Sequence, residues 1–187
     1  MKTTERREFE DLALPLLDSA YRTALRLSGR PAAAEDLVQE AFLRAFRGFA
    51  QFQRGSNFKA WFFRILTNTF LNEYRRSTHE PKTYDFTEAD PVDPAGAPAA
   101  FRVDQVDELR KHLGDEAARA VDRLPVEFRL AFLLSAFEGF PYKDIAEILS
   151  IPIGTVMSRL FRARRMLRED LMEYAVASGF LKDRDTA

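Results

Sequence analysis

The chain has 187 residues, of which 46% are hydrophobic and 30% charged, a composition typical of a soluble protein with one ordinary domain or two small ones. It has no cysteine and only two histidines, His79 and His112, far apart in the sequence. This excludes disulfides and thiolate metal sites, and we expect no metal and no cofactor. No apolar run is long enough to span a bilayer, and the charged first residues lack the apolar core of a signal peptide. We therefore expect a cytoplasmic protein without membrane insertion.

The net charge of −1 hides a strong segregation of charge along the chain. Residues 44–76 hold six arginines and one lysine against a single acid, whereas residues 82–122 hold ten acids against five bases. This pattern predicts two basic functional surfaces separated by an acidic connecting segment.

Apolar residues at helical spacing predict three helices in the first half of the chain, over residues 9–28, 32–49 and 58–76. In the first of these, Leu12 and Leu16 belong to the predicted inward stripe. A polar turn around Arg54-Gly55 precedes the third helix.

The composition changes abruptly between residues 81 and 98, where prolines, glycine and acids predict a linker. Helical patterning resumes over residues 102–124 and 126–137, and residues 178–187 are typical of a fraying tail. We predict an all-α fold of two small helical domains joined by a flexible, acidic, Pro-rich linker. The predicted boundaries are 1–80, 81–112 and 113–187.

The most informative segment is a short helix, a tight turn and an arginine-rich helix. Ile145, Ala146 and Leu149 give the first helix an apolar stripe. Pro152 cannot continue a helix, and Gly154 is free to adopt turn dihedrals.

Thr155 is placed to cap the second helix, whose Val156, Leu160 and Ala163 are predicted to face inward. This helix has no acidic residue before Arg168 and carries five arginines: Arg159, Arg162, Arg164, Arg165 and Arg168. A helix-turn-helix with a cationic second helix fits a DNA major groove. The alternative is the solvated basic face of an ordinary core helix, but the clean turn and the missing acids favour DNA binding.

The second predicted helix turns Asp36, Gln39, Glu40 and Arg44 away from its main apolar stripe, together with Leu43. From composition alone, this is a solvated face held by local ion pairs, each contributing about 0.3–0.5 kcal/mol.

The turn and the third helix combine seven aromatic residues with cations and amides. Single-stranded DNA binding uses such a mixture, because bases stack on rings while cations hold phosphates. Most of the rings are expected to form a core, but Phe52 lies in a turn and Trp61 lies between two cations. The candidates are Phe52, Arg54, Asn57, Lys59, Trp61 and Asn68.

Several segments together resemble the signature regions of extracytoplasmic-function sigma factors, group IV of the sigma-70 family, over about residues 9–174. They are similar most of all to the actinobacterial oxidative-stress members, whose anti-sigma partners bind zinc. The segments are Asp36-Leu-Val-Gln-Glu-Ala-Phe42, Phe58-Lys-Ala-Trp-Phe-Phe-Arg-Ile-Leu-Thr-Asn68, Leu124-Pro125, Tyr142-Lys-Asp-Ile-Ala-Glu-Ile148 and Ile153-Gly-Thr-Val-Met-Ser-Arg-Leu160.

The resemblance implies binding to core RNA polymerase through the β′ clamp helices and the β flap. The β′ clamp helices would be met by the face containing Asp36, Gln39, Glu40 and Leu43, which replaces the solvated-face interpretation. It also implies that Phe52 and Asn68 contact the melted −10 strand. It implies further that Asn72, Arg75 and Arg76 contact the DNA duplex upstream of the −10 element.

In the second domain, the resemblance implies that Ser158, Arg159, Phe161 and Arg162 read or hold the −35 element, and we add Thr155 and Arg165 as neighbours on the same helix. Many family members carry arginine where this chain has Met157, so that contact is apolar or absent.

The implied function is that of a sigma factor, not an enzyme, which recognises −35 and −10 elements and helps melt DNA in a stress response. The inhibitory domain of housekeeping sigma factors has no expected counterpart here, so restraint is expected from an anti-sigma factor. Without cysteine in this chain, any thiol-based sensing belongs to that partner. The main rival is a stand-alone helix-turn-helix regulator, which leaves the Asp36 face and the aromatic-basic helix unexplained. An enzyme is disfavoured, because the chain shows no phosphate loop and no nucleophile with a neighbouring base.

Overall fold

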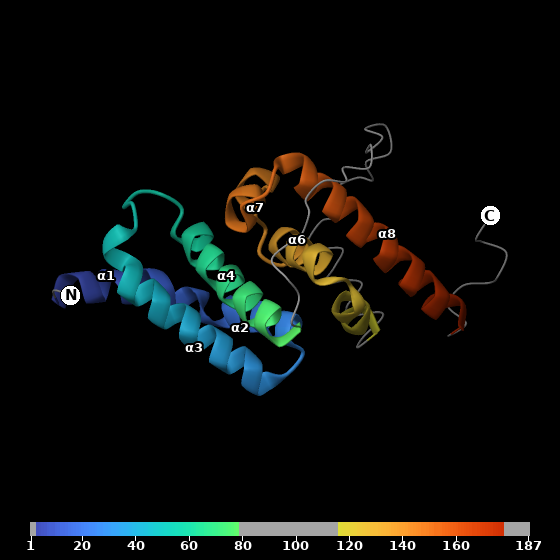
Figure 1. Ribbon diagram of the computed structural model, residues 1–187, viewed down its shortest axis with the longest axis horizontal. Helices are drawn as coiled ribbons and strands as arrows, with labels where there is room; N and C mark the ends of the chain where they lie inside the picture. Colours follow the sequence, from blue (N-terminus) through green and yellow to red (C-terminus); the bar gives the residue numbers. More distant parts are fainter. Residues whose placement is uncertain (1–2, 79–115, 178–187) are drawn as a thin grey trace. The chain divides into compact units, whose positions relative to one another are not determined.

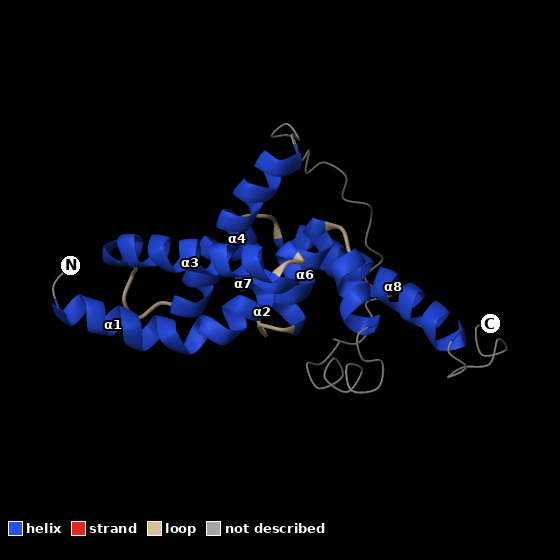
Figure 2. Ribbon diagram, turned by 90° about the horizontal axis from the view of Figure 1, so that it is seen from below, coloured by secondary structure: helices blue, strands red, loops and turns tan. Residues whose placement is uncertain are grey.

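The computed structural model describes residues 3–78 and 116–177, and all regular structure in these ranges is helical (Figures 1 and 2). The all-α prediction is confirmed. The described residues form two compact units, one with residues 3–78 and 140–153, the other with residues 116–139 and 154–177. The predicted linker, both histidines and the predicted tail lie outside the described residues.

The first unit begins with two helices where the sequence predicted one. The prediction of a single helix over residues 9–28 is wrong, because a 3₁₀ turn that contains Pro15 interrupts it and leaves Leu12 and Leu14 exposed. Proline has no N–H to donate within a helix. The elements are α1 (Thr3–Ala13), η1 (Leu14–Leu16), α2 (Leu17–Ser28), α3 (Pro31–Gly48), η2 (Phe49–Gln51) and α4 (Phe58–Thr78).

The helix ends follow local chemistry. Gly29 adopts a left-handed conformation (φ 69°) at the end of α2, and its N–H donates to the Leu25 carbonyl. Pro31 then starts α3, where a missing N–H costs nothing. At the start of α4, the Asn57 side-chain oxygen accepts a hydrogen bond from the Ala60 N–H at 3.0 Å.

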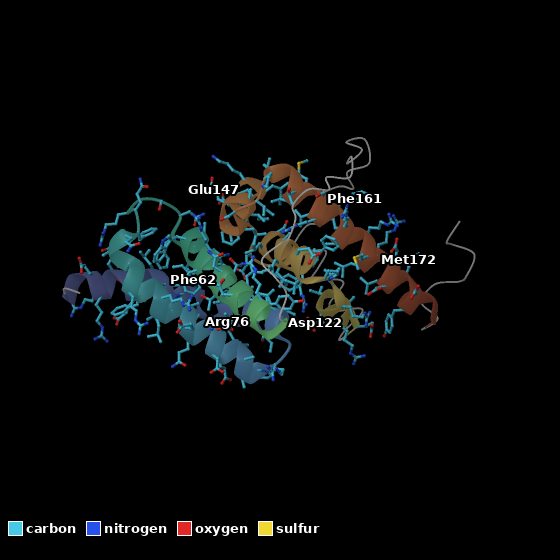
Figure 3. The ribbon with its side chains drawn as sticks, viewed as in Figure 1. Phe62, Arg76, Asp122, Glu147, Phe161 and Met172 are labelled. Carbon is cyan, nitrogen blue, oxygen red and sulfur yellow. The ribbon has the colours of Figure 1, made fainter. Side chains whose placement is uncertain are left out.

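Helices α2, α3 and α4 each pack against the other two (Figure 1). On α4, Phe62, Phe63 and Leu66 are fully buried, and Figure 3 shows Phe62 on this helix. Thr67 and Thr69 are buried beside them, and their hydroxyls donate at 2.8 Å to backbone carbonyls one turn earlier. The buried face of α4 therefore carries no unpaired hydroxyl.

An aromatic cluster joins α1 to the far end of this bundle. Phe9 of α1 makes edge-to-face contacts with Phe46, Phe49 and Phe58, with ring centroids 5.3–6.1 Å apart, a favourable geometry for ring quadrupoles. The aromatic cluster consists of Phe9, Phe46, Phe49, Phe52, Phe58 and Trp61.

Helix α7 (Tyr142–Leu149) belongs to the first unit, where it packs against α4. Its buried residues are Ile145 and Ile148, whereas Ala146 and Leu149 are only half-buried, so the predicted stripe was partly wrong. The turn after α7 also differs from the prediction. Ser150 adopts the left-handed conformation (φ 55°), which allows the Ile151 N–H to reach the Ala146 carbonyl at 3.0 Å.

Helix α8 (Ile153–Ala177) consequently starts two residues earlier than expected, with Gly154 and Thr155 inside its first turn. The predictions of a Gly154 turn and a Thr155 cap are therefore wrong. Val156, Leu160 and Ala163 are fully buried, as predicted.

The second unit also contains α6 (Val126–Ala136) and a helical segment over residues 116–123. Arg123 links this segment to α8, because its guanidinium donates to Glu116 at 2.9 Å and to Asp170 at 3.1 Å. Those hydrogen bonds raise the pKa of Arg123, and hydrogen bonding to Arg123 lowers the pKa of Glu116.

Two glycines of the first unit should respond to alanine with opposite signs. Gly29→Ala places a side chain in the left-handed region, which should lower the free energy of unfolding by about 1 kcal/mol. Gly48→Ala, at the end of α3, adds a methyl at ordinary contact distance (3.8 Å) from Trp61. Because it also restricts the unfolded chain, it should raise the free energy by about 0.5 kcal/mol. Urea unfolding followed by fluorescence of Trp61, the single tryptophan, measures both. Equal effects of the two substitutions would contradict this account.

Candidate nucleic-acid interface

An apolar groove of about 610 Å³ lies between α1–α2 and α3 in the first unit. Leu43 is 42% exposed and Leu17 is 45% exposed, and both line this groove. Gln39 lies one helical turn before Leu43 and also lines it. Exposed leucines gathered around a groove are typical of a surface that binds another protein.

The rest of this predicted face is polar. Asp36 is exposed, and Glu40 accepts a 2.6 Å hydrogen bond from the Arg44 Nε. That hydrogen bond lowers the pKa of Glu40. The structure therefore places all four predicted residues (Asp36, Gln39, Glu40, Leu43) on one side of α3, with the local ion pair beside an apolar surface.

A second face lies along α4. Spacings of seven, four and three residues put Trp61, Asn68, Asn72 and Arg75 on one side of the helix, opposite the buried phenylalanines. Asn68 and Asn72 are exposed, and Arg76, marked in Figure 3, continues the face toward the helix end.

Arg64 was not among the candidates from the sequence, although it lies on the same face of α4. Arg64 is exposed and lies four residues before Asn68, and its Nη2 donates to the Ser150 hydroxyl at 3.4 Å. The helical spacing alone could have identified it.

The remaining −10 candidates lie around the start of α4. Asn57 caps this helix and also donates to Asp144 at 3.3 Å. The Lys59 ammonium lies over the Phe63 and Phe140 rings, at 5.7 and 5.1 Å from their centroids, which is favourable for a cation.

Phe52 is part of the aromatic cluster rather than an open platform. It is 5% exposed, it stacks on Phe49 with centroids 5.9 Å apart, and it contacts Phe58 and Trp61. Its place in a turn had left open whether this ring belongs to the core, and the structure buries it there. Its role in holding a base stays a prediction.

Arg54 forms a two-pronged ion pair with Glu8 of α1. Its Nε donates to the two carboxylate oxygens at 2.9 and 3.1 Å, and its Nη2 donates to Oε2 at 3.0 Å. The hydrogen bonds and then the charge of Glu8 raise the pKa of Arg54.

The third face lies along α8, in the second unit. Thr155, Ser158, Arg162 and Arg165 follow spacings of three, four and three residues, away from the buried residues. Arg159 is half-buried at the side of this face. The Arg165 Nε donates to Glu169 at 2.9 Å, with its side chain 69% exposed.

An apolar strip borders this cationic face. Ile153, Met157 and Phe161 are spaced by four residues and are 51%, 47% and 36% exposed; Figure 3 labels Phe161 on α8. Met157 and Phe161 were discussed individually from the sequence, whereas Ile153 appeared only as the start of a matching segment, although the spacing of four places it on the same strip.

The described ranges contain no group of three or more histidine, aspartate or glutamate side chains that could hold a metal ion. Within those same ranges, no helix combines the length and apolar character needed to cross a bilayer.

Two family models define the class of protein as a sigma-70 factor. The family model described as sigma-70 region 2 matches residues 12–80, and the model described as sigma-70, region 4 matches residues 115–167. The chain belongs to the extracytoplasmic-function (ECF) RNA polymerase sigma factors.

Two relatives support this assignment. ECF RNA polymerase sigma factor EcfG of Rhodopseudomonas palustris is 37% identical over 84% of this chain and 81% of its own length. ECF RNA polymerase sigma factor SigE of Mycolicibacterium smegmatis is also 37% identical, over 89% of this chain, which spans 63% of that relative. Neither relative's name refers to oxidative stress, so the likeness to oxidative-stress members stays a prediction.

The fold is also similar to a solved structure, the sigma factor RpoE in complex with the anti-sigma factor NepR from Bartonella quintana. The TM-score is 0.67 at 32% identity, and the match covers 89% of this chain and 98% of that one.

The exposed Arg165 provides a test of the α8 face. If Arg165 holds a phosphate, Arg165→Ala in reconstituted holoenzyme should weaken binding to all −35 duplexes alike and lower the salt slope by about 1. Glu169→Gln is the matched control, because it removes the carboxylate that competes for Arg165 and should leave binding equal or tighter. Loss at one base position only, measured across a set of −35 variants, would contradict the phosphate role.

Proposed function

We propose that this chain binds core RNA polymerase through the α3 face, reads the −10 element with α4 and the preceding loop, and reads the −35 element with α8. The observation that carries this proposal is the pair of Gln39 and the exposed Leu43 on the rim of an apolar groove. A regulator that binds DNA alone needs no such surface. The protein acts as a transcription initiation factor, and its binding partners are promoter DNA and core polymerase.

The docking partner that fits the groove is the β′ clamp helices of core polymerase, and the family resemblance assigns the β flap to the second unit. An apolar rim with a glutamine at its edge suits a helix that presents leucines or other apolar side chains. The Glu40–Arg44 ion pair beside it supplies charge at the border of the interface, where it affects specificity more than affinity.

Charged residues on this rim should abolish docking. The double variant Gln39→Lys with Leu43→Glu should no longer co-purify with core polymerase, because both charges would have to lose their water when this apolar surface is covered. Ala32→Glu is the matched control: Ala32 is exposed on the first turn of α3, outside the groove lining. Circular dichroism should show unchanged helicity in both. Core binding by the double variant at the wild-type level would contradict the docking proposal.

The α4 face fits the melted −10 strand and the duplex upstream of it. Amides on Asn68 and Asn72 offer donors and acceptors to bases, and the arginines at the end of the helix offer charge to phosphates. Flipping a base costs a few kcal/mol of unstacking, which such contacts offset.

A substitution of the exposed Asn68 should affect promoter melting but not polymerase docking. Asn68→Ala should keep core binding but lower the yield of open complexes by roughly two- to tenfold, the range for one lost hydrogen bond. On a template whose −10 region is already mismatched, most of the transcription should return, because unstacking is then cheaper. Permanganate reactivity of −10 thymines and run-off transcription measure the two effects. Gln51→Ala, another exposed amide, is the control. Normal melting by Asn68→Ala would contradict its −10 role.

Regulation by an anti-sigma factor is part of the proposal. Its support is the 32% identity to a sigma factor solved with the anti-sigma factor NepR. Zinc binding by the partner, a stress response and action in the cytoplasm rest on the family resemblance.

A further inference from the structure

The loop between η2 and α4, residues 52–57, contains a tight turn that is held by local hydrogen bonds. The Phe52 N–H donates to the Phe49 carbonyl at 3.0 Å, and both the N–H and the hydroxyl of Ser56 donate to the Gln53 carbonyl, at 3.1 and 2.7 Å. Gly55, with φ 89°, makes the tight reversal possible. The loop therefore behaves as one piece, whose position depends on how it is attached to the helices.

One attachment reaches back 46 residues to α1. Arg54 grips the Glu8 carboxylate through three hydrogen bonds of 2.9–3.1 Å, and its guanidinium carbon lies 5.4 Å from the centroid of the Phe49 ring. A planar guanidinium held at its edge by a carboxylate and at its face by a ring has a defined orientation.

This geometry does not suit a phosphate contact by Arg54. Its Nε and Nη2 already donate to Glu8, and the Glu8 carboxylate, 37% exposed, would repel an approaching phosphate. The loop it fixes carries Phe52 at one end and the α4 cap Asn57 at the other. Moving the loop would thus disturb both the aromatic cluster and the start of the α4 face.

We propose that Arg54 is a positioning residue, which with Glu8 clamps the 52–57 loop to α1 in the conformation that receives the −10 strand. The inference rests on the proposed −10 function of this loop and of α4. It assigns a part in promoter melting to Glu8, a residue of α1 far from the DNA-contacting candidates in sequence.

The test uses full-length protein in holoenzyme with three changes: Glu8→Gln, Arg54→Gln, and the exchanged pair Glu8→Arg with Arg54→Glu. A clamp predicts that both single changes lower open-complex formation about two- to fivefold, the range for a partly exposed ion pair. The salt slope of promoter binding should stay unchanged, and the exchanged pair should recover most of the loss. The matched control is Glu10→Gln, which removes one negative charge and a local Arg6 ion pair from the same helix and should have no effect.

A phosphate-binding Arg54 gives a different pattern. Arg54→Gln would then lower the salt slope by about 1, Glu8→Gln would leave melting equal or improved, and the exchanged pair would be as defective as Arg54→Gln. That pattern would overturn the proposal.

A second measurement does not depend on promoter activity. Amide hydrogen exchange of residues 52–57 in the free sigma factor should be faster in both single variants and restored in the exchanged pair. Unchanged protection in Glu8→Gln would overturn the clamp. If wild-type holoenzyme failed to melt promoters while exchange followed the predicted pattern, the proposed function would fail and the clamp would stand.

Discussion

The first unit depends on the packing of the aromatic cluster around Phe9, because no other described contact joins so many of its elements. The six rings come from α1, α3, η2, the 52–57 loop and α4. Burying a phenylalanine side chain contributes about 2 kcal/mol each, and edge-to-face geometry adds to this. The cluster includes Phe52 of the loop that precedes α4, so the stability of this unit and the conformation of its candidate DNA-binding loop have a common origin. A substitution in the cluster therefore cannot be interpreted as a change in DNA contacts alone.

Much of the fold was predictable, because helices report their buried faces through spacing. The inward positions Val156, Leu160 and Ala163 were predicted from spacing and are buried. The errors arose where backbone dihedrals are decided locally. Spacing carried the first predicted helix through Pro15, and glycine was preferred over Ser150 for the left-handed turn, although serine adopted it. Such choices depend on the competition between a few hydrogen bonds, which periodicity does not reveal.

The candidate site was predictable in its helical parts and less so in its loop. Helical spacing places Asn68 with Asn72, and it could have added Arg64. The pairing of Arg54 with Glu8 joins residues 46 positions apart, and no local pattern encodes it. Phe52 is buried against rings only three to nine positions away, but helical spacing does not report contacts made by a turn. A polar turn with an aromatic and an arginine was therefore interpreted as a DNA-contacting surface, whereas in the structure both side chains are engaged within the protein.

Helix α8 runs without interruption for 25 residues, from Ile153 to Ala177, a length of about 37 Å at 1.5 Å per residue. Its candidate base-reading residues occupy the N-terminal half, and Asp170, which holds Arg123, lies in the C-terminal half. An α-helix of this length resists bending, so the two halves rotate together. A tilt of a few degrees imposed near Asp170 displaces the other end by ångströms. The Arg123–Asp170 pair and the candidate −35 residues therefore keep a fixed orientation relative to one another along α8.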